Sequence, residues 1–311
     1  MNDIYQKTLS KKVSFKGIGL HSGSSSKINV IPASEDHGIV FKRIDIKENN
    51  LIEANFRNVS STKLCTTLEN NKGVKVSTVE HLLAAFYISG VDNALVEIDN
   101  EEVPIMDGSS KDFLQTLNQI TLIEQNKKRK YLKILSKIKL TDGNRSISIE
   151  PNKNKKESFE VDFQLNYENK IIGNQKNFID FQKDNLADVI SSRTFCLFED
   201  IEKIKKIGLA KGGSLDNAVV VDDEKVLNKG GLRNDKEFVN HKILDLAGDF
   251  LLSGYRVLGK VFCYQGGHEL TNLFLKEIFN SKSSFQSIAL KNLEVSKKLH
   301  NKQLEKIAVN A

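Results

Sequence analysis

The sequence predicts an α+β fold of two domains, with sheets and helices packed in layers. Its 311 residues exceed the roughly 100 to 200 that one domain usually contains. Strand-like alternation and helical periodicity occur on both sides of a polar run, residues 124–130, that interrupts the apolar pattern. We therefore place the domains at residues 1–125 and 131–295.

The first domain reads as short strands followed by a helix, a strand and a second helix. Residues 77–87 have helical periodicity, residues 93–98 alternate as a strand does, and residues 110–119 are again helical. The glycine-rich segment 17–23 lacks the Lys and the Ser or Thr of a P-loop and the helix that follows one. We expect backbone turns there and no nucleotide loop.

The second domain mixes both element types, with glycines marking its loops. The basic tail after Ser296 carries no pattern. The predicted elements are a strand over 131–140, a helix near 181–191, a loop at 212–213, a long helix over 235–252, a strand over 257–264 and a helix after Glu269.

Composition excludes a membrane-spanning or secreted protein. The longest uncharged stretch, residues 81–91, is far shorter than the roughly 18 apolar residues of a membrane helix. The N-terminus has no secretory signal pattern, and the three cysteines form neither a disulfide framework nor a metal-binding pair. We therefore expect a cytoplasmic monomer.

The net charge of +6 is modest and permits an anionic small-molecule partner or loose contact with a membrane surface. The lysine runs have no interleaved aromatic residues of the kind that bind single-stranded nucleic acid. We expect no nucleic-acid partner.

Three polar residues share one face of the long predicted helix at 235–252. At about 100° per residue, His241, Asp245 and Asp249 fall within an arc of roughly 80°, and apolar residues fill the opposite side. A His and an Asp four residues apart can bind one zinc ion. The same spacing arises by chance on a solvated face, and the spacing alone favours that simpler interpretation.

A second segment, residues 77–86, places Glu80 beside His81 at the start of a helix. Ser77 and Glu80 have the spacing of a capping box, which is the purely structural interpretation. His81 points away from the apolar stripe, and a Glu beside a metal-binding His can accept a proton without occupying a coordination position. Together the two segments supply the ligands and base of an open catalytic zinc site.

Two further segments have simple interpretations on their own. His268 follows a glycine pair after the predicted strand, where loops commonly present functional side chains, although an isolated surface His is more frequent. Residues 195–222 gather apolar side chains around Gly212 and Gly213, and periodicity alone favours an ordinary packed insert.

Taken in order, these segments resemble the UDP-3-O-acyl-N-acetylglucosamine deacetylase (LpxC) family over residues 11–279. The resemblance rests on many ordered stretches, none of which would suffice alone. They are GIGLHSG (17–23), LCT (64–66), STVEHL (77–82), PIMDGS (104–109), SRTF (192–195), GGS (212–214), VVDD (220–223), LR (232–233), HKILD (241–245) and GH (267–268).

The resemblance implies hydrolysis of the N-acetyl amide of UDP-3-O-(3-hydroxyacyl)-N-acetylglucosamine with release of acetate, the committed step of lipid A biosynthesis in Gram-negative bacteria. It implies two domains of similar layered topology with zinc between them, and iron(II) as an alternative ion in the same site. The implied ligands are His81, His241 and Asp245.

The resemblance also assigns the remaining chemistry. Glu80 becomes the general base, and Thr194 and protonated His268 stabilise the tetrahedral oxyanion beside the metal. His268 also protonates the leaving amine, and Asp249 orients it.

For the substrate, the resemblance places Lys242 near the diphosphate and Tyr167 on the uracil. Gln265 stands where some family members carry a basic residue, so other lysines would replace that contact. The insert at 195–222 becomes a hydrophobic passage for the acyl chain. The implied contacts there and beside the site are Leu64, Cys65, Phe195, Ile201, Ala210, Gly213, Ser214, Leu215, Ala218 and Val220.

Two alternatives remain open. Two His and one carboxylate also describe the facial triad of non-haem iron oxygenases, but nothing indicates a clamp for a 2-oxo acid. A non-catalytic sugar-nucleotide binding protein on the same fold would be expected to lose Glu80 or His268, and both are present.

Overall fold

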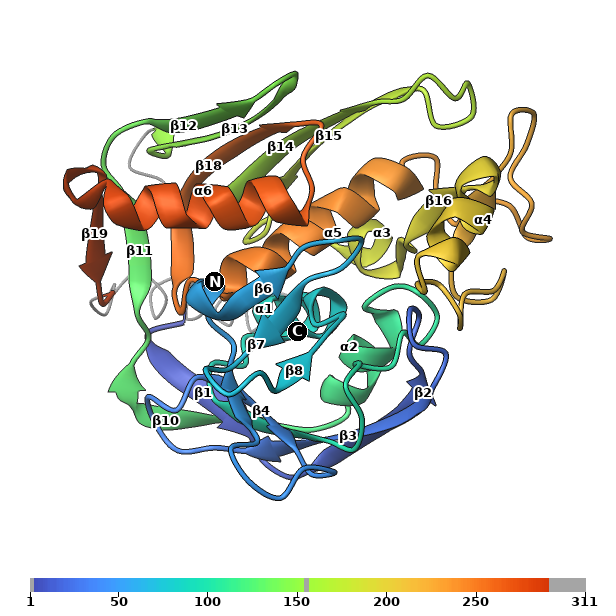
Figure 1. The fold of residues 1–311 in the computed structure, drawn as a ribbon. Helices are drawn as coiled ribbons and strands as arrows, with labels where there is room; N and C mark the ends of the chain where they lie inside the picture. Colours follow the sequence, from blue (N-terminus) through green and yellow to red (C-terminus); the bar gives the residue numbers. More distant parts are fainter. Residues whose placement is uncertain (1–2, 154–156, 291–311) are drawn as a thin grey trace, which may run out of the picture.

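The structure is a computed structural model that describes residues 3–153 and 157–290. Figure 1 shows strands of residues 5–128 in its lower half and strands of residues 131–288 in its upper half. No sheet within the described residues combines strands from both sides of residues 129–130. The α+β prediction is confirmed, and we propose that the domains divide at this linker. Residues 291–295 and the tail after Ser296 lie outside the described residues.

The first half contains a five-stranded sheet that faces two helices (Figure 1). Its elements are β1 (Tyr5–Leu9), β2 (Val13–Ile18), β3 (Ser25–Pro32), β4 (Ile39–Arg43), β5 (Leu51–Glu53), β6 (Val59–Ser61), β7 (Thr67–Glu69), β8 (Lys75–Val76), α1 (Glu80–Ser89), β9 (Ala94–Ile98), α2 (Lys111–Leu117) and β10 (Leu122–Lys128). The sheet order is β2-β3-β9-β4-β5. Residues on β9 alternate in burial because only one face of this sheet packs on the core.

The second half contains a seven-stranded sheet covered by helices. Its elements are β11 (Tyr131–Ile134), β12 (Ile138–Asp142), β13 (Arg145–Glu150), β14 (Phe159–Asn166), β15 (Asn174–Asp180), α3 (Ala187–Ser191), β16 (Phe195–Leu197), α4 (Phe198–Lys206), β17 (Val219–Val221), α5 (Glu237–Leu251), β18 (Arg256–Tyr264), α6 (His268–Asn280) and β19 (Phe285–Ile288). The main path runs β12-β13-β18-β11-β19, and β14 joins β18 to β15. No helix among the described residues has the length and apolar character needed to cross a bilayer.

Some predicted elements differ from the structure. The polar run at 124–130 is mostly strand, because β10 pairs with β1 and leaves most of its side chains exposed. The single strand predicted at 131–140 is two strands, β11 and β12, at separate places in the sheet. The helix predicted at 181–191 forms only as α3, because β15 extends to Asp180 and a turn follows it.

Helices α1 and α5 pack against each other between the two halves (Figure 1). Helix α1 is buried along nearly its whole surface, which explains its weak amphipathic pattern. Gly248 on α5 permits the close approach, since a Cβ atom there would lie 2.1 Å from the carbonyl oxygen of Glu80. This packing sets the first turn of α1 beside the C-terminal half of α5.

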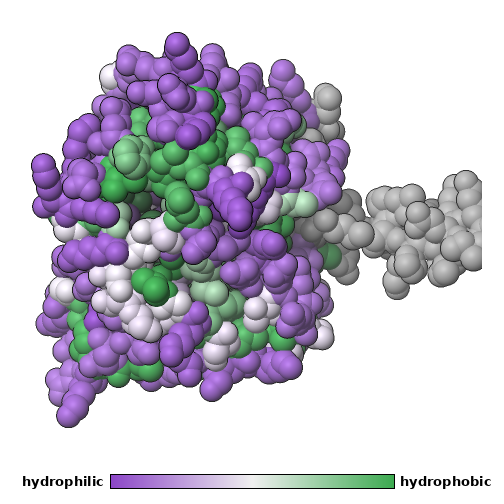
Figure 2. All heavy atoms as spheres, turned by 90° about the vertical axis from the view of Figure 1, so that its right-hand side faces the viewer, coloured by the Kyte–Doolittle hydropathy of each residue, from purple (hydrophilic) through white to green (hydrophobic). Residues whose placement is uncertain are grey.

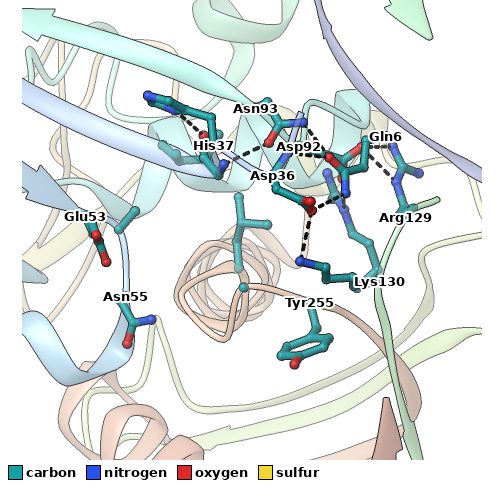
Figure 3. Close-up of a pocket in the computed structure, with 16 residues that line it drawn as sticks. Gln6, Asp36, His37, Glu53, Asn55, Asp92, Asn93, Arg129, Lys130 and Tyr255 are labelled. Carbon is teal, nitrogen blue, oxygen red and sulfur yellow. Dashed lines mark hydrogen bonds and ion pairs between the residues drawn. The ribbon is translucent and has the colours of Figure 1, made fainter. Parts of the chain in front are cut away.

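Two arginines hold the opposite end of α1. Arg256 of β18 donates to the carbonyl oxygen of Val91 at 2.8 Å, and Arg129 donates to that of Gly90 at 2.7 Å and to Asp92. Carbonyl groups at a helix C-terminus have no partner within the helix, so these contacts satisfy them. Figure 3 shows Arg129 and Asp92 at this junction, beside a cavity of about 230 Å³. The linker is therefore fixed to the end of α1.

Candidate metal centre and adjoining cavities

Three helices carry the residues that the sequence indicated. The first turn of α1, one face of α5 and the first residue of α6 meet where the halves join. These positions hold Glu80, His81, His241, Asp245, Asp249 and His268, and all six are buried.

Glu80 does not form the capping box that its spacing with Ser77 suggested. Thr78 has φ +56°, so the helix begins at Glu80, and the Ser77 hydroxyl donates to the carbonyl oxygen of Glu101 at 3.2 Å. The Glu80 carboxylate accepts a hydrogen bond from the backbone N–H of Thr66 at 3.1 Å. The capping-box interpretation of this Glu is therefore wrong.

Potential metal ligands converge from both halves of the molecule. The Oδ1 atom of Asp245 lies 3.4 Å from Nε2 of His81 and 3.3 Å from Nε2 of His241, and the ligand atoms of all three lie within 4.8 Å of one another. Two ligands about 2.1 Å from a tetrahedral ion lie about 3.4 Å apart, so the spacing fits a metal. The buried Oδ1 atom has no hydrogen-bond partner in the part of the chain that the structure describes.

The charge states of these groups also suit a metal. Burial lowers the pKa of His241 to about 3, so its ring is neutral at pH 7. Its Nδ1–H group donates to the carbonyl oxygen of Ser192 at 3.1 Å, which leaves a lone pair on Nε2 facing Asp245. Although burial opposes it, the positive charge of Lys242 lowers the pKa of Asp245, which stays ionised. Neutral imidazole and carboxylate are the forms that bind metals.

His268 and Glu80 form a second group beside the ligands. The Nδ1–H group of His268 donates to Asp249 at 2.8 Å, and its Nε2 atom lies 3.7 Å from Glu80 Oε1. Burial alone would lower the pKa of His268, but Asp249 and Glu80 outweigh it and raise the pKa to about 9. Burial also raises the pKa of Glu80. A protonated imidazole therefore faces a carboxyl group whose pKa burial raises.

A polar cavity of about 290 Å³ adjoins these groups. Among its lining residues, Lys242 places Nζ 3.1 Å from Asp245 Oδ2 and 5.6 Å from the centre of the Phe195 ring. Tyr167 contacts the same ring edge to face, at 6.0 Å between centroids. The predicted residues on this cavity are Leu64, Glu80, His81, Tyr167, Thr194, Phe195, His241, Lys242, Asp245 and His268.

Arg145 lines this cavity and was not predicted. It lies at the start of β13, where its guanidinium donates to Glu269 at 3.0 Å, and no local motif marks it. Gln265, in contrast, accepts a hydrogen bond from the backbone N–H of Asn166 at 2.8 Å. Arg145 therefore supplies a cation at the cavity. It comes from β13 and not from the loop that contains Gln265.

An apolar cavity of about 340 Å³ adjoins the polar one, and the two share Leu20, Leu64, Thr194 and Phe195. The insert around α4 forms its wall, and Figure 2 shows an apolar patch over this face, bordered by hydrophilic side chains. The predicted residues on it are Leu64, Thr194, Phe195, Ile201, Ala210, Gly213, Ser214, Leu215, Ala218 and Val220.

Some lining residues were not predicted, and one predicted contact lies elsewhere. Leu20 and His21 come from the glycine-rich segment, which forms the expected turns with Glu102 accepting from the backbone N–H of His21 at 2.8 Å. Phe198 belongs to α4, a helix that periodicity alone did not distinguish from an ordinary packed insert. Among the described residues, Cys65 is buried beside the site but lines neither cavity.

The fold and site define an α+β protein with a candidate three-ligand metal centre between its two halves. The chain belongs to the UDP-3-O-acyl N-acetylglycosamine deacetylase (LpxC) family, whose model matches residues 6–280. Similar proteins named UDP-3-O-acyl-N-acetylglucosamine deacetylase occur in Geotalea uraniireducens, at 40% identity over 92% of each chain, and in Pseudoalteromonas translucida, at 39% identity over 91% of this chain and 93% of the relative. The relative in Saccharophagus degradans is 39% identical over 94% of this chain and 96% of its own.

Proposed function

We propose that the protein hydrolyses the N-acetyl amide of UDP-3-O-(3-hydroxyacyl)-N-acetylglucosamine and releases acetate, in lipid A biosynthesis. The observation that carries the proposal is the convergence of His81, His241 and Asp245 beside Glu80, in a cavity that continues into an apolar one. The names of the relatives support the same substrate. We further propose that the enzyme acts in the cytoplasm as a monomer.

His81, His241 and Asp245 would hold zinc, and iron(II) would suit the same donor set. When bound, such an ion supplies Lewis acidity and lowers the pKa of a coordinated water toward about 7. The three side chains lie on two helices that pack closely, so the ligands need little rearrangement to bind the ion. That preorganisation favours affinity.

Glu80 acts as general base in this proposal. One of its oxygens accepts from the backbone N–H of Thr66, which leaves Oε1 directed toward His268 and the cavity. A pKa raised by burial brings a carboxylate closer to the operating pH, which favours proton transfer. Glu80 thus removes the proton from the attacking water.

His268 acts as the cation and acid of the site. With Nδ1 directed to Asp249, its protonated Nε2–H group stabilises negative charge developing on the amide oxygen and then protonates the leaving amine. The Thr194 hydroxyl would assist at the oxyanion. The backbone of Thr194 is fixed by hydrogen bonds to Gly108 and Val219, at 2.8 Å each.

The polar cavity would bind the UDP-sugar part of the substrate, and the apolar cavity would bind its acyl chain. Lys242 and Arg145 would bind the diphosphate, and Arg145 supplies the cation that Gln265 does not. Tyr167 would stack on the uracil, and the apolar cavity would take the acyl chain. Burying ten methylene groups at about 0.8 kcal/mol each would give a gross gain of roughly 8 kcal/mol before ordering costs. Such a gain would make the acyl chain a principal determinant of specificity.

The proposal is tested by acetate release from the acylated UDP-sugar, measured with and without a chelator. We expect activity to disappear with the metal and to return when zinc is restored. Glu80→Gln should keep its metal and lose roughly 100-fold or more in kcat, whereas Glu101→Gln, at a nearby exposed position, should not change it. Binding of the UDP-sugar without acetate release would instead indicate a non-catalytic sugar-nucleotide binding protein.

A further inference from the structure

Four residues at the site form a closed ring of contacts in which Thr66 is the member without an assigned role. Its backbone N–H donates to Glu80 Oε2 at 3.1 Å, and its hydroxyl donates to Asp249 Oδ1 at 2.7 Å. The other oxygen of Asp249 accepts from His268 Nδ1 at 2.8 Å. The Nε2 atom of His268 then faces Glu80 Oε1 at 3.7 Å, which closes the ring.

We propose that Thr66 is a positioning residue that fixes the relative orientation of His268, the acid of the proposed deacetylation, and Glu80, its base. It contacts both carboxylates directly and reaches His268 through Asp249. Within the described residues it lines neither cavity at the site, so it acts through these partners and not on the substrate. The inference rests on the proposed function.

The contacts of Thr66 join the two halves of the molecule. Thr66 directly precedes β7 in the first half, whereas Asp249 lies on α5 in the second. Thr66 is only 2% exposed, so water cannot readily replace its hydroxyl as a donor. A carboxylate that accepts on both oxygens has a fixed orientation, and it transmits that orientation to the imidazole it binds.

Removal of the hydroxyl is the direct test. Thr66→Val keeps the size and branching of the side chain but leaves Asp249 Oδ1 without its donor. We expect kcat to fall on the order of 10- to 100-fold with KM and metal content unchanged, as is typical when a supporting hydrogen bond is lost. Thr66→Ser restores the donor and should recover most of the rate.

Thr271→Val is the matched control. This threonine is equally buried and loses a hydrogen bond to the Gly267 carbonyl oxygen, so it reproduces the packing change without touching Asp249. If Thr66→Val does not fold, Thr66→Ala also removes the hydroxyl and can be compared with Thr66→Ser in its place. A fall in kcat that Thr271→Val matches, or that Thr66→Ser does not repair, overturns the proposal.

A second readout needs no substrate. We expect the proton in the hydrogen bond between His268 and Asp249 to give a downfield nuclear magnetic resonance signal that shifts in Thr66→Val and returns to its position in Thr66→Ser. If the wild type releases no acetate but this signal shifts, the proposed function fails and the positioning contact stands. An unchanged signal refutes the role of Thr66 whatever the substrate.

Discussion

Substitution of Gly248 by Ala tests whether the close packing of α1 on α5 is what brings the metal ligands together. The added Cβ atom would lie 2.1 Å from the carbonyl oxygen of Glu80, whereas such contacts are ordinarily no shorter than about 3.3 Å. Helix α1 must therefore move by about 1 Å, and His81 moves with it, away from His241 and Asp245. Metal sites tolerate ligand displacements of about 0.2 Å, so affinity falls.

The same substitution should have a small effect on stability. Overpacking costs about 1–3 kcal/mol, and replacing a helical Gly by Ala returns about 1 kcal/mol. We expect turnover to fall about 100-fold and zinc to be lost on dialysis against a chelator, while the melting temperature drops only a few degrees. Gly230→Ala, where a Cβ meets nothing within 4 Å, is the control. Full zinc occupancy and full turnover in Gly248→Ala would refute this account of the packing.

Two further predictions concern the acyl cavity and the buried thiols. Ala218→Phe should exclude about three methylene groups at about 0.8 kcal/mol each, and so lower kcat/KM on long-chain substrates by about 50-fold while sparing short-chain ones; equal losses on both would argue against the passage. Burial raises the pKa of Cys65 and of Cys263 to about 12, so both thiols stay protonated until the pH approaches that value. Iodoacetamide at pH 8 should therefore label neither thiol in the folded protein and both after denaturation, and rapid labelling of the native state would contradict the stated burial.

Helices and strands that pack on the core along their whole length were predicted most accurately, because their apolar periodicity is uninterrupted. Helix α5 and strand β18 differ from their predicted bounds by at most two residues at either end. The spacing of Ser77 and Glu80 wrongly predicted a helix that begins at Ser77, because tertiary contacts of Ser77 outweighed its tendency to cap a helix. The backbone N–H of Ser77 donates to the carbonyl oxygen of Glu101 at 2.8 Å. This bond holds Ser77 in a β-bridge with Glu102, so the helix begins later in the sequence.

The site itself could be predicted only in part from local patterns. The spacing of His241 and Asp245 follows from one helix, but their convergence with His81 depends on packing between residues about 160 positions apart, as the resemblance to a family implied. Arg145 was missed because only the register of β13 on β18 carries it to the cavity. Thr66 was missed because its side-chain partner Asp249 is 183 residues away in the sequence.

X-ray absorption at the zinc edge of the zinc-loaded protein tests whether His81, His241 and Asp245 bind the metal. We expect two imidazole nitrogens and one carboxylate oxygen at about 2.0–2.2 Å from zinc, with one imidazole fewer in His81→Ala. A sulfur scatterer at about 2.3 Å, as from Cys65, or an unchanged imidazole count in His81→Ala, would contradict it.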